Sequence, residues 1–202
     1  MNGSGNRALL VVDVQESFRR HELWPTISNP DIVAPVSTLV DHARAEGDQV
    51  VWVLHTEPGT GNVFDPSSGH VRPMADLTPA GDEPVLTKTA HNAFTTTGLD
   101  RILTRLGVRE LAVCGIRTEQ CCETTARIAA DLGYDVDFVT DATATNPVAH
   151  RDAPAGRSVG ELLADPRTLQ TGEIIARTEY ALSGRFATIR SVAEVTGSGW
   201  PA

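Results

Sequence analysis

Short apolar runs alternate along the chain with longer stretches in which apolar residues recur every three or four positions. The short runs are rich in β-branched residues and predict strands, whereas the longer stretches predict amphipathic helices. The expected strands cover residues 8–14, 49–55, 84–88, 110–116, 135–140 and 173–178. The expected helices cover residues 31–46, 98–106, 118–132, 158–164 and 185–195. This alternation indicates a doubly wound α/β fold with a parallel sheet.

Two long connections interrupt the pattern, at about 56–83 and about 143–157. Loops of this length often form the walls or lids of functional sites. The first six residues contain no apolar segment of the kind found in signal peptides. The tail from Gly197 to Ala202 is expected to fray.

Composition favours one acidic, globular domain. The whole chain, 1–202, fits a single domain, because domains of ~100–200 residues are the usual size. The formal net charge is −9 and no basic cluster is present, which argues against nucleic acid as a partner. No apolar run approaches the ~18 residues that a membrane span requires. Three cysteines, two of them adjacent, argue against a disulfide framework and favour a reducing, cytoplasmic compartment.

Three reactive residues follow three of the expected strands. Asp13 and Lys88 close the apolar runs that precede them, and Cys121 lies just beyond 110–116, where a helix should begin. Ligands of open parallel sheets bind outside the carboxyl ends of the strands, so these side chains can meet at one place. An acid, an ammonium and a thiol together are the catalytic groups expected of a cysteine hydrolase.

The segment around Cys121 predicts an activated thiol. Thr118 is a good N-cap residue, which places Cys121 in the first helical turn, near unpaired N–H groups and the positive end of the dipole. Both features favour the thiolate, lower the pKa of a cysteine and suit the binding of an oxyanion. Cys114 lies inside an expected strand and Cys122 points about one helical step away, so both are interpreted as buried apolar residues.

Asp13 and Lys88 each allow two interpretations. Asp13 is a candidate acid–base group that takes the thiol proton and later delivers it to the leaving amine, but an acid here also suits a helix cap or a metal ligand. Lys88 is a candidate partner that holds the Asp13 carboxylate and favours the thiolate. Lysines at strand ends, however, are often simply solvated.

The same residues lie in three motifs. These read Asp13-Val-Gln15-Glu-Ser-Phe18, Lys88-Thr-Ala-His-Asn-Ala-Phe94 and Gly115-Ile-Arg-Thr118-Glu-Gln-Cys121-Cys-Glu-Thr-Thr-Ala126. In this order and at strand ends, they make the chain resemble the isochorismatase-like cysteine hydrolases, which include nicotinamidases and N-carbamoylsarcosine amidases. The resemblance covers most of the chain, from about Leu9 to Thr178.

The resemblance implies a three-layer α/β/α sandwich around a six-stranded, mainly parallel sheet of order 3-2-1-4-5-6. It also implies a catalytic triad of Asp13, Lys88 and Cys121. A cis peptide bond between Ile116 and Arg117 is expected, with an oxyanion hole formed by the backbone N–H groups of Arg117 and Cys121. The candidate substrate-binding residues are Gln15, Phe18, Trp24, His55, Phe94, Ile116 and Arg117. Relatives suggest a homodimer or homotetramer acting on a small molecule.

Departures from the family pattern refine the expected activity. Nicotinamidases bind a metal through an Asp-x-His pair and a further His, but here the region reads Val53-Leu-His55-Thr-Glu57 and the Asp is missing. We therefore predict neither a metal nor another cofactor. The presence of Cys121 favours cleavage of a C–N bond in a small amide, ureido or lactam compound through a thioester. The alternatives are a vinyl ether hydrolase of the isochorismatase type and a non-catalytic family member.

Several candidate substrate contacts have a structural alternative. His55 and Glu57 line the pocket, or His55 is a loop residue satisfied by backbone groups. Arg117 binds a substrate carboxylate through its planar fork, or it points outward and pairs with Glu119 or a neighbouring subunit. The aromatic candidates form an apolar wall or belong to the core; they are Phe18, Trp24 and Phe94.

Overall fold

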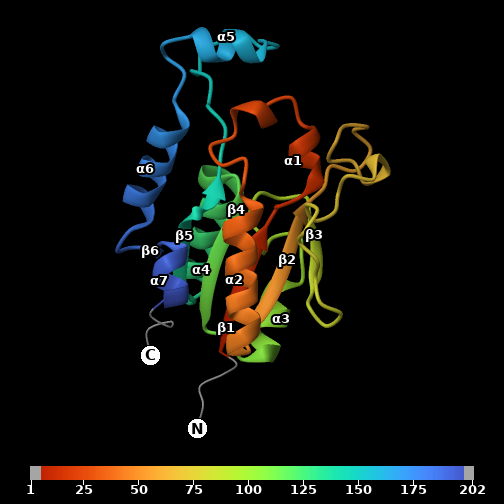
Figure 1. The fold of residues 1–202 in the computed structure, drawn as a ribbon, viewed down its shortest axis with the longest axis vertical. Coiled ribbons are helices and arrows are strands. Elements are labelled where there is room, and N and C mark those ends of the chain that lie inside the picture. Colours follow the sequence, from red (N-terminus) through yellow and green to blue (C-terminus); the bar gives the residue numbers. More distant parts are fainter. Residues whose placement is uncertain (1–5, 198–202) are drawn as a thin grey trace.

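A computed structural model describes residues 6–197 of the chain. These residues form one parallel sheet with the predicted order, β3-β2-β1-β4-β5-β6 (Figure 1). The strands are β1 (Arg7–Val12), β2 (Gln49–His55), β3 (Val85–Lys88), β4 (Glu110–Ile116), β5 (Asp135–Ala144) and β6 (Thr188–Arg190). The predictions for the N-terminal residues and for the frayed tail fall largely on 1–5 and 198–202, outside the described residues.

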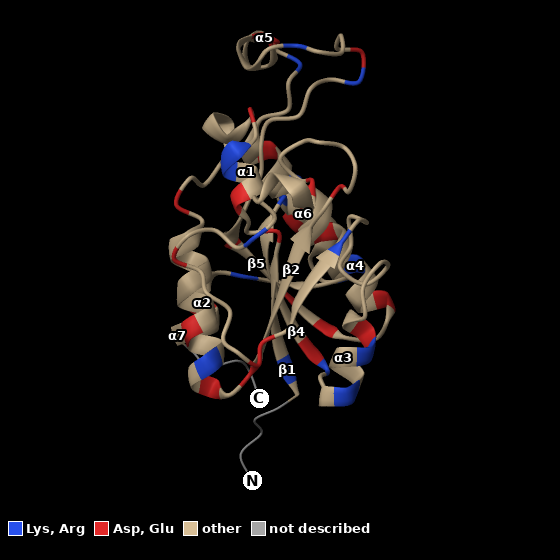
Figure 2. Ribbon diagram, turned by 90° about the vertical axis from the view of Figure 1, so that its right-hand side faces the viewer, with Lys and Arg blue, Asp and Glu red and all other residues tan. Residues whose placement is uncertain are grey.

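Helices cover both faces of the sheet, which gives the predicted three layers (Figure 2). Two helices, α2 and α7, pack on one face, whereas α3, α4 and α6 pack on the other. The α-helices are α1 (Glu16–Arg20), α2 (Val33–Glu46), α3 (Leu99–Leu106), α4 (Glu123–Asp131), α5 (Val159–Ala164), α6 (Thr171–Leu182) and α7 (Val192–Gly197). Shorter turns are η1 (Trp24–Thr26), η2 (Pro66–Ser68) and the π-helical η3 (Thr118–Cys122).

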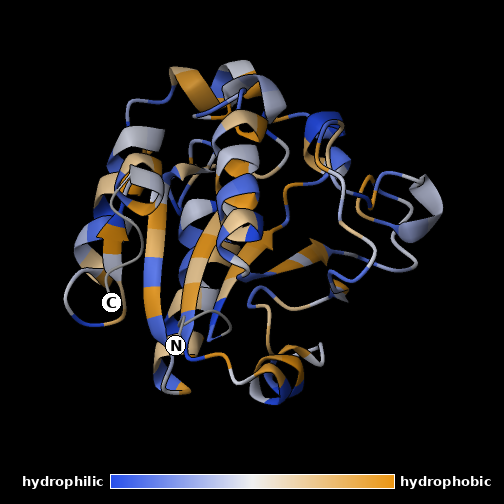
Figure 3. Cartoon of the chain, turned by 60° about the horizontal axis from the view of Figure 1, so that its bottom comes forward, coloured by the Kyte–Doolittle hydropathy of each residue, from blue (hydrophilic) through white to orange (hydrophobic). Residues whose placement is uncertain are grey.

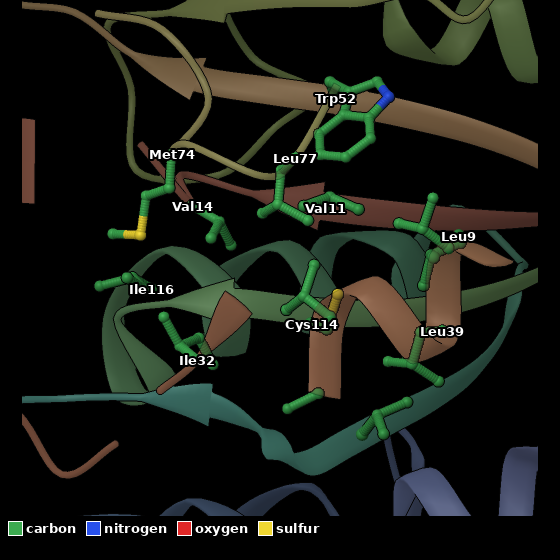
Figure 4. Packing of buried hydrophobic residues seen from close by; sticks show 14 of the residues in the cluster. Leu9, Val11, Val14, Ile32, Leu39, Trp52, Met74, Leu77, Cys114 and Ile116 are labelled. Atoms are coloured by element: carbon green, nitrogen blue, oxygen red, sulfur yellow. The ribbon is translucent and has the colours of Figure 1, made fainter. Parts of the chain in front are cut away.

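Each central strand contributes to two cores, because successive side chains point to opposite faces of the sheet. In β1, Leu9 and Val11 belong to the core beneath α2 and α7, whereas Leu10 and Val12 belong to the core beneath α3 and α4. Figure 4 shows the first of these cores, in which Cys114 lies among aliphatic side chains. Apolar residues fill the central strands, and the surrounding helices are mixed in polarity (Figure 3). Burial on both faces explains why the strands read as continuous apolar runs.

The predicted sixth strand is wrong, and the predicted last helix, 185–195, is correct only over its final residues, which lie in α7. Residues 173–178 belong to α6, in which Ile174, Thr178 and Leu182 recur at helical spacing and are buried. The sixth strand is β6, which lies inside the range 185–195 that the pattern assigned to a helix, and α7 follows it. Short apolar runs do not distinguish a strand from a helix by pattern alone, and here packing at the sheet edge determines which forms.

The chain turns sharply where β1 ends. Asp13 has a φ of 56°, in the left-handed region that Asp adopts more readily than most residues. Its backbone N–H donates to the carbonyl oxygen of Val53 at 2.7 Å, which ties the end of β1 to β2. The first strand therefore stops at Val12, short of its predicted end, and the helix α1, which was not predicted, begins at Glu16.

Gly115 lies where β4 passes close to the end of β1. Its φ is 128°, and a Cβ added there would overlap the carbonyl oxygen of Val12, the residue before Asp13. Gly115→Ala is therefore expected to lower the free energy of unfolding by about 1–3 kcal/mol and to reduce activity by displacing Asp13. Urea unfolding is the measurement, and wild-type stability would contradict the prediction. Gly172→Ala is the control, because its added methyl group meets no atom within 4 Å.

Candidate active site

Three side chains meet at the carboxyl end of the sheet. The ammonium of Lys88 donates to Asp13 Oδ2 at 2.7 Å and to the Sγ of Cys121 at 3.3 Å. Asp13 and Lys88 have no exposed surface, and Cys121 is 7% exposed. The structure thus brings together the three residues that the sequence singled out. Lys88 is not the solvated strand-end lysine of the alternative interpretation.

Each of the three residues is positioned by a different element. Asp13 follows β1 at the left-handed turn, Lys88 is the last residue of β3, and Cys121 lies in η3, directly after β4. Parallel strands end at one edge of the sheet, which is why residues 75 and 33 positions from Lys88 reach it. The peptide bond between Ile116 and Arg117, at the end of β4, is cis, as the family resemblance implied.

One oxygen of the Asp13 carboxyl group is free to accept a proton. Oδ1 is buried and makes no hydrogen bond of good geometry within residues 6–197. The Cys121 thiol is nevertheless close enough to interact with this carboxyl group electrostatically. Asp13 is therefore anchored through Oδ2 by Lys88, and Oδ1 remains available to accept a proton from the thiol.

All three groups bind their protons more tightly than they would in water. Burial raises the pKa of Asp13, and this effect outweighs the opposing charge of Lys88. Burial alone would lower the pKa of Lys88, but the negative charges of Asp13 and Cys121 reverse the direction and raise it. Burial, and then the charge of Asp13, raise the pKa of Cys121, and Lys88 opposes them only in part. The site at rest therefore holds an ammonium and a neutral thiol.

The prediction of a lowered cysteine pKa is wrong. It rested on the helix dipole and on N–H groups near Cys121, whereas the observed position is almost fully buried and lies beside a carboxyl group. Desolvation penalises the charged form of a thiol and here exceeds the stabilisation by Lys88. The thiol consequently needs a base to become a nucleophile, and Asp13 is the group in reach.

The other two cysteines belong to the core, as predicted. Cys114 and Cys122 have no exposed surface, and neither forms a disulfide. Burial raises the pKa of Cys114 to about 12 and raises that of Cys122 well above its ordinary value. Of the three thiols, only Cys121 contacts Lys88, so it is the candidate nucleophile.

Gln15 and His55 join the ends of β1 and β2. The amide of Gln15 donates to the backbone oxygen of His55 at 3.0 Å and accepts from its N–H at 2.7 Å, and it also donates to Ser17. Gln15 is fully buried, which favours a positioning role over the predicted contact with substrate. The His55 ring is not satisfied by backbone groups, because Nε2 contacts Glu57 at 3.2 Å and Nδ1 is buried without a partner among residues 6–197.

The three aromatic candidates do not form one wall. Phe18 and Trp24 pack in the core beneath α2, whereas Phe94 stacks on Tyr134 in the opposite core. Ile116 is also fully buried in the core, so its side chain is closed to solvent.

Sequence reasoning missed Phe64, an aromatic residue that packs against the candidate residue His55. Phe64 contacts the rings of Phe18, His21 and His55, with ring centroids 5.1, 6.1 and 5.7 Å apart. It lies in the long connection 56–83, where no periodic pattern marks which side chain folds inward. Only the path of the loop reveals it.

Arg117 does not pair with Glu119. The Oε2 of Glu119 instead accepts a hydrogen bond from Thr145 at 2.6 Å, and its Oε1 is buried without a partner among the described residues. Arg117 is partly buried, and it forms neither a hydrogen bond nor an ion pair through its side chain within residues 6–197. Its charge is close enough to act on both Cys121 and His21.

Two open cavities lie away from this site. One, of about 800 Å³, lies at the amino ends of β5 and β6, and the other, of about 460 Å³, lies beside the end of α2. Neither is lined by a member of the triad. We take the triad, not the larger cavity, as the candidate site, because only the triad combines a nucleophile with a base.

The part of the chain that the structure describes holds no group of three or more His, Cys, Asp or Glu side chains suited to a metal ion. Metal independence therefore stays a prediction from the sequence. Among residues 6–197, no helix is long and apolar enough to cross a membrane.

The fold and the buried triad place this chain among the doubly wound α/β proteins with a cysteine-bearing site at the carboxyl end of the sheet. The family model of the isochorismatase domain matches residues 7–163. The chain therefore belongs to the isochorismatase family and is a hydrolase of that family.

Individual relatives agree with this assignment. Streptothricin hydrolase of Streptomyces noursei is 31% identical over 194 residues, which cover 93% of this chain and 65% of that protein. Nicotinamidase 3 of Arabidopsis thaliana is 32% identical over 151 residues, covering 68% of this chain and 73% of the relative. An isochorismatase structure from Pseudomonas putida KT2440 superposes with a TM-score of 0.80 at 28% identity, covering 93% and 89% of the two chains.

Proposed function

We propose that this hydrolase cleaves a C–N bond of a small amide, ureido or lactam compound, without a metal, through a thioester on Cys121. The observation that carries the proposal is the position of Lys88, whose ammonium contacts Asp13 Oδ2 and the Sγ of Cys121 while Asp13 Oδ1 stays free. A nucleophile, a base and the group that orients the base are thus within reach of one another.

In the first half of the reaction, Oδ1 of Asp13 accepts the thiol proton as Sγ of Cys121 attacks the carbonyl carbon. The carbonyl oxygen then carries a negative charge, which the backbone N–H groups of Arg117 and Cys121 are predicted to bind. The C–N bond breaks, and Asp13 returns its proton to the departing nitrogen. Ammonia or an amine leaves, and the acyl group remains on sulfur.

In the second half, water replaces the amine. Asp13 takes a proton from the water while the oxygen of that water attacks the thioester carbon. Asp13 then gives the proton to the departing sulfur of Cys121. The products are a carboxylic acid and the free thiol, so one water is consumed for each C–N bond cleaved. Lys88 keeps its proton throughout, because its pKa is raised, and it stabilises both the carboxylate and the transient thiolate.

Similarity to named relatives supports the amide bond as the target. One relative carries the name nicotinamidase, and another is a hydrolase of streptothricin. The metal-binding Asp-x-His pair of nicotinamidases is replaced here by Val53-Leu-His55, which lacks the Asp. Nicotinamide itself is therefore not the proposed substrate.

Ammonia release from a panel of small amides, ureido acids and lactams tests the proposal. We expect release from at least one class without added metal, and the same rate after treatment with a chelator. Release of pyruvate from isochorismate, with no ammonia from any amide, would instead establish the ether hydrolase alternative.

The pH dependence of kcat/KM should report on Asp13. The base must be ionised to accept the thiol proton, so activity should be lost as pH falls through its pKa. Burial raises that pKa above the ordinary 3.8, so the acid limb should lie above pH 3.8. Circular dichroism over the same range separates this loss from unfolding. An acid limb at or below the ordinary value would argue against Asp13 as the base.

A further inference from the structure

Arg117 is an unpaired cation at the edge of the proposed active site. It follows the last residue of β4 and precedes η3, which carries Cys121. Within residues 6–197, its guanidinium has no hydrogen-bond or ion-pair partner. Glu119, the nearest acidic residue in sequence, is engaged with Thr145 instead.

The Arg117 side chain is partly buried, but none of its nitrogens is among the fully buried side-chain atoms that lack a partner, so a ligand can reach them from solvent. Partial burial removes some of the water from its five N–H donors, and in most proteins a carboxylate or carbonyl group takes the place of such water. Burial lowers the pKa of Arg117, and the charges of Glu119 and Cys121 oppose this only in part. Arg117 therefore carries donors and a positive charge that the described part of the chain does not satisfy.

The charge of Arg117 also acts on His21. Burial lowers the pKa of His21, and the positive charge of Arg117 lowers it further. The ring of His21 contacts Phe64, which in turn contacts His55. The charge of Arg117 thus acts on the thiol of Cys121 and on His21, which packs against Phe64.

We propose that Arg117 binds a carboxylate of the substrate, so that the substrate is an amide or ureido compound bearing a carboxylate beside the scissile carbonyl group. The guanidinium fork matches the two oxygens of a carboxylate, and such a ligand would give this partly buried cation the partner that it lacks among residues 6–197. This inference rests on the proposed amide hydrolysis and narrows its substrate class.

Matched pairs of amides test the inference. Malonamate, succinamate and glutaramate each carry one amide and one carboxylate, and their diamides replace the carboxylate by a neutral group of the same shape. For the best of the three, wild-type kcat/KM should exceed that of its diamide. Arg117→Ala should lower kcat/KM for the acid by about 10–100-fold more than for its diamide, mainly through KM, because only the acid offers a carboxylate to the guanidinium. Arg117→Lys should lie between, because it keeps the charge but not the fork.

A surface control and a binding measurement complete the design. Arg105→Ala removes an exposed arginine from α3 and should leave both substrates unaffected. Calorimetry should measure the affinity of Cys121→Ala for the same three acids, with and without the additional Arg117→Ala change. Because Cys121→Ala lacks the nucleophile, this experiment measures substrate binding without turnover. Binding that requires Arg117 supports the inference even if no amide is hydrolysed, which would count only against the proposed function.

Three outcomes would overturn the inference. One is an equal effect of Arg117→Ala on the acids and the diamides. Another is the absence of any preference for the acids in both turnover and binding. The third is a change in sedimentation mass in Arg117→Ala with unchanged selectivity, which would assign Arg117 to a contact with a second copy of the chain.

Discussion

Replacing Cys121 with alanine should abolish hydrolysis and leave the protein folded. The thiol is the only nucleophile in contact with Lys88 and the carboxyl group of Asp13 among the described residues. Its loss should lower kcat by at least about 10⁴-fold, as removal of a covalent nucleophile does in other hydrolases. The free energy of unfolding should change by only about 1 kcal/mol, because one long hydrogen bond from Lys88 is lost. Ammonia release and urea unfolding measure the two effects.

Cys122→Ala is the matched control, since it removes the adjacent thiol, which is fully buried and forms no hydrogen bond with Lys88. It should retain activity and lose about 1 kcal/mol of stability, a typical cost for a core substitution. Retained amide hydrolysis in Cys121→Ala would exclude the thioester. An equal loss of activity in both variants would mean that the nucleophile has been assigned to the wrong cysteine.

Lys88→Met should be the most destabilising change in the site. Lys88 and Asp13 are both fully buried and 2.7 Å apart, so removal of the ammonium leaves a carboxyl group without compensation. Breaking a buried ion pair from one side costs about 3–5 kcal/mol. Activity should also disappear, because Asp13 loses the contact that anchors its Oδ2 and the thiolate loses its cation.

The pH dependence of this variant has a definite sign. Burial already raises the pKa of Asp13, and loss of Lys88 raises it further. A folded-state pKa above the unfolded value means that the protonated, uncharged carboxyl group is tolerated, so stability is highest at acidic pH and falls as pH rises through that pKa. Urea unfolding at acidic and alkaline pH should show a larger deficit at alkaline pH.

The double variant Lys88→Met/Asp13→Asn provides the control. Replacing the carboxylate by a neutral amide removes the uncompensated charge, so the double variant should recover part of the stability lost in Lys88→Met. It should not recover activity, because the base is gone. If single and double variants were equally unstable, the loss would come from packing and not from the buried charge.

The strand pattern of the sequence was sufficient for the meeting of the three reactive residues, and the family resemblance of its motifs implied the order of the sheet. Asp13, Lys88 and Cys121 each follow a run of β-branched residues, and parallel strands must end at a common edge. The motif around Cys121 also separated the reactive cysteine from Cys114 and Cys122, which are buried in the core.

The same patterns failed for the last third of the chain. Residues 173–178 contain apolar positions that suit either a strand or one face of a helix, and the partners of β5 at the sheet edge determine which forms. The strand that pairs there, β6, is only three residues long, too short to produce a periodic signal.

Burial and electrostatics at the site were decided by the tertiary structure. The helix-turn argument for Cys121 was local, whereas the desolvation that raises its pKa comes from chain segments far away in sequence. Phe64 packs against the ring of His55 from a loop without a pattern, and Arg117 does not pair with Glu119, one oxygen of which accepts a hydrogen bond from Thr145. A sequence determines which reactive groups face one edge of a sheet, because strand periodicity is a local property. Which of those groups lose water, and which lack a partner, depends on contacts between distant segments that only the folded chain defines.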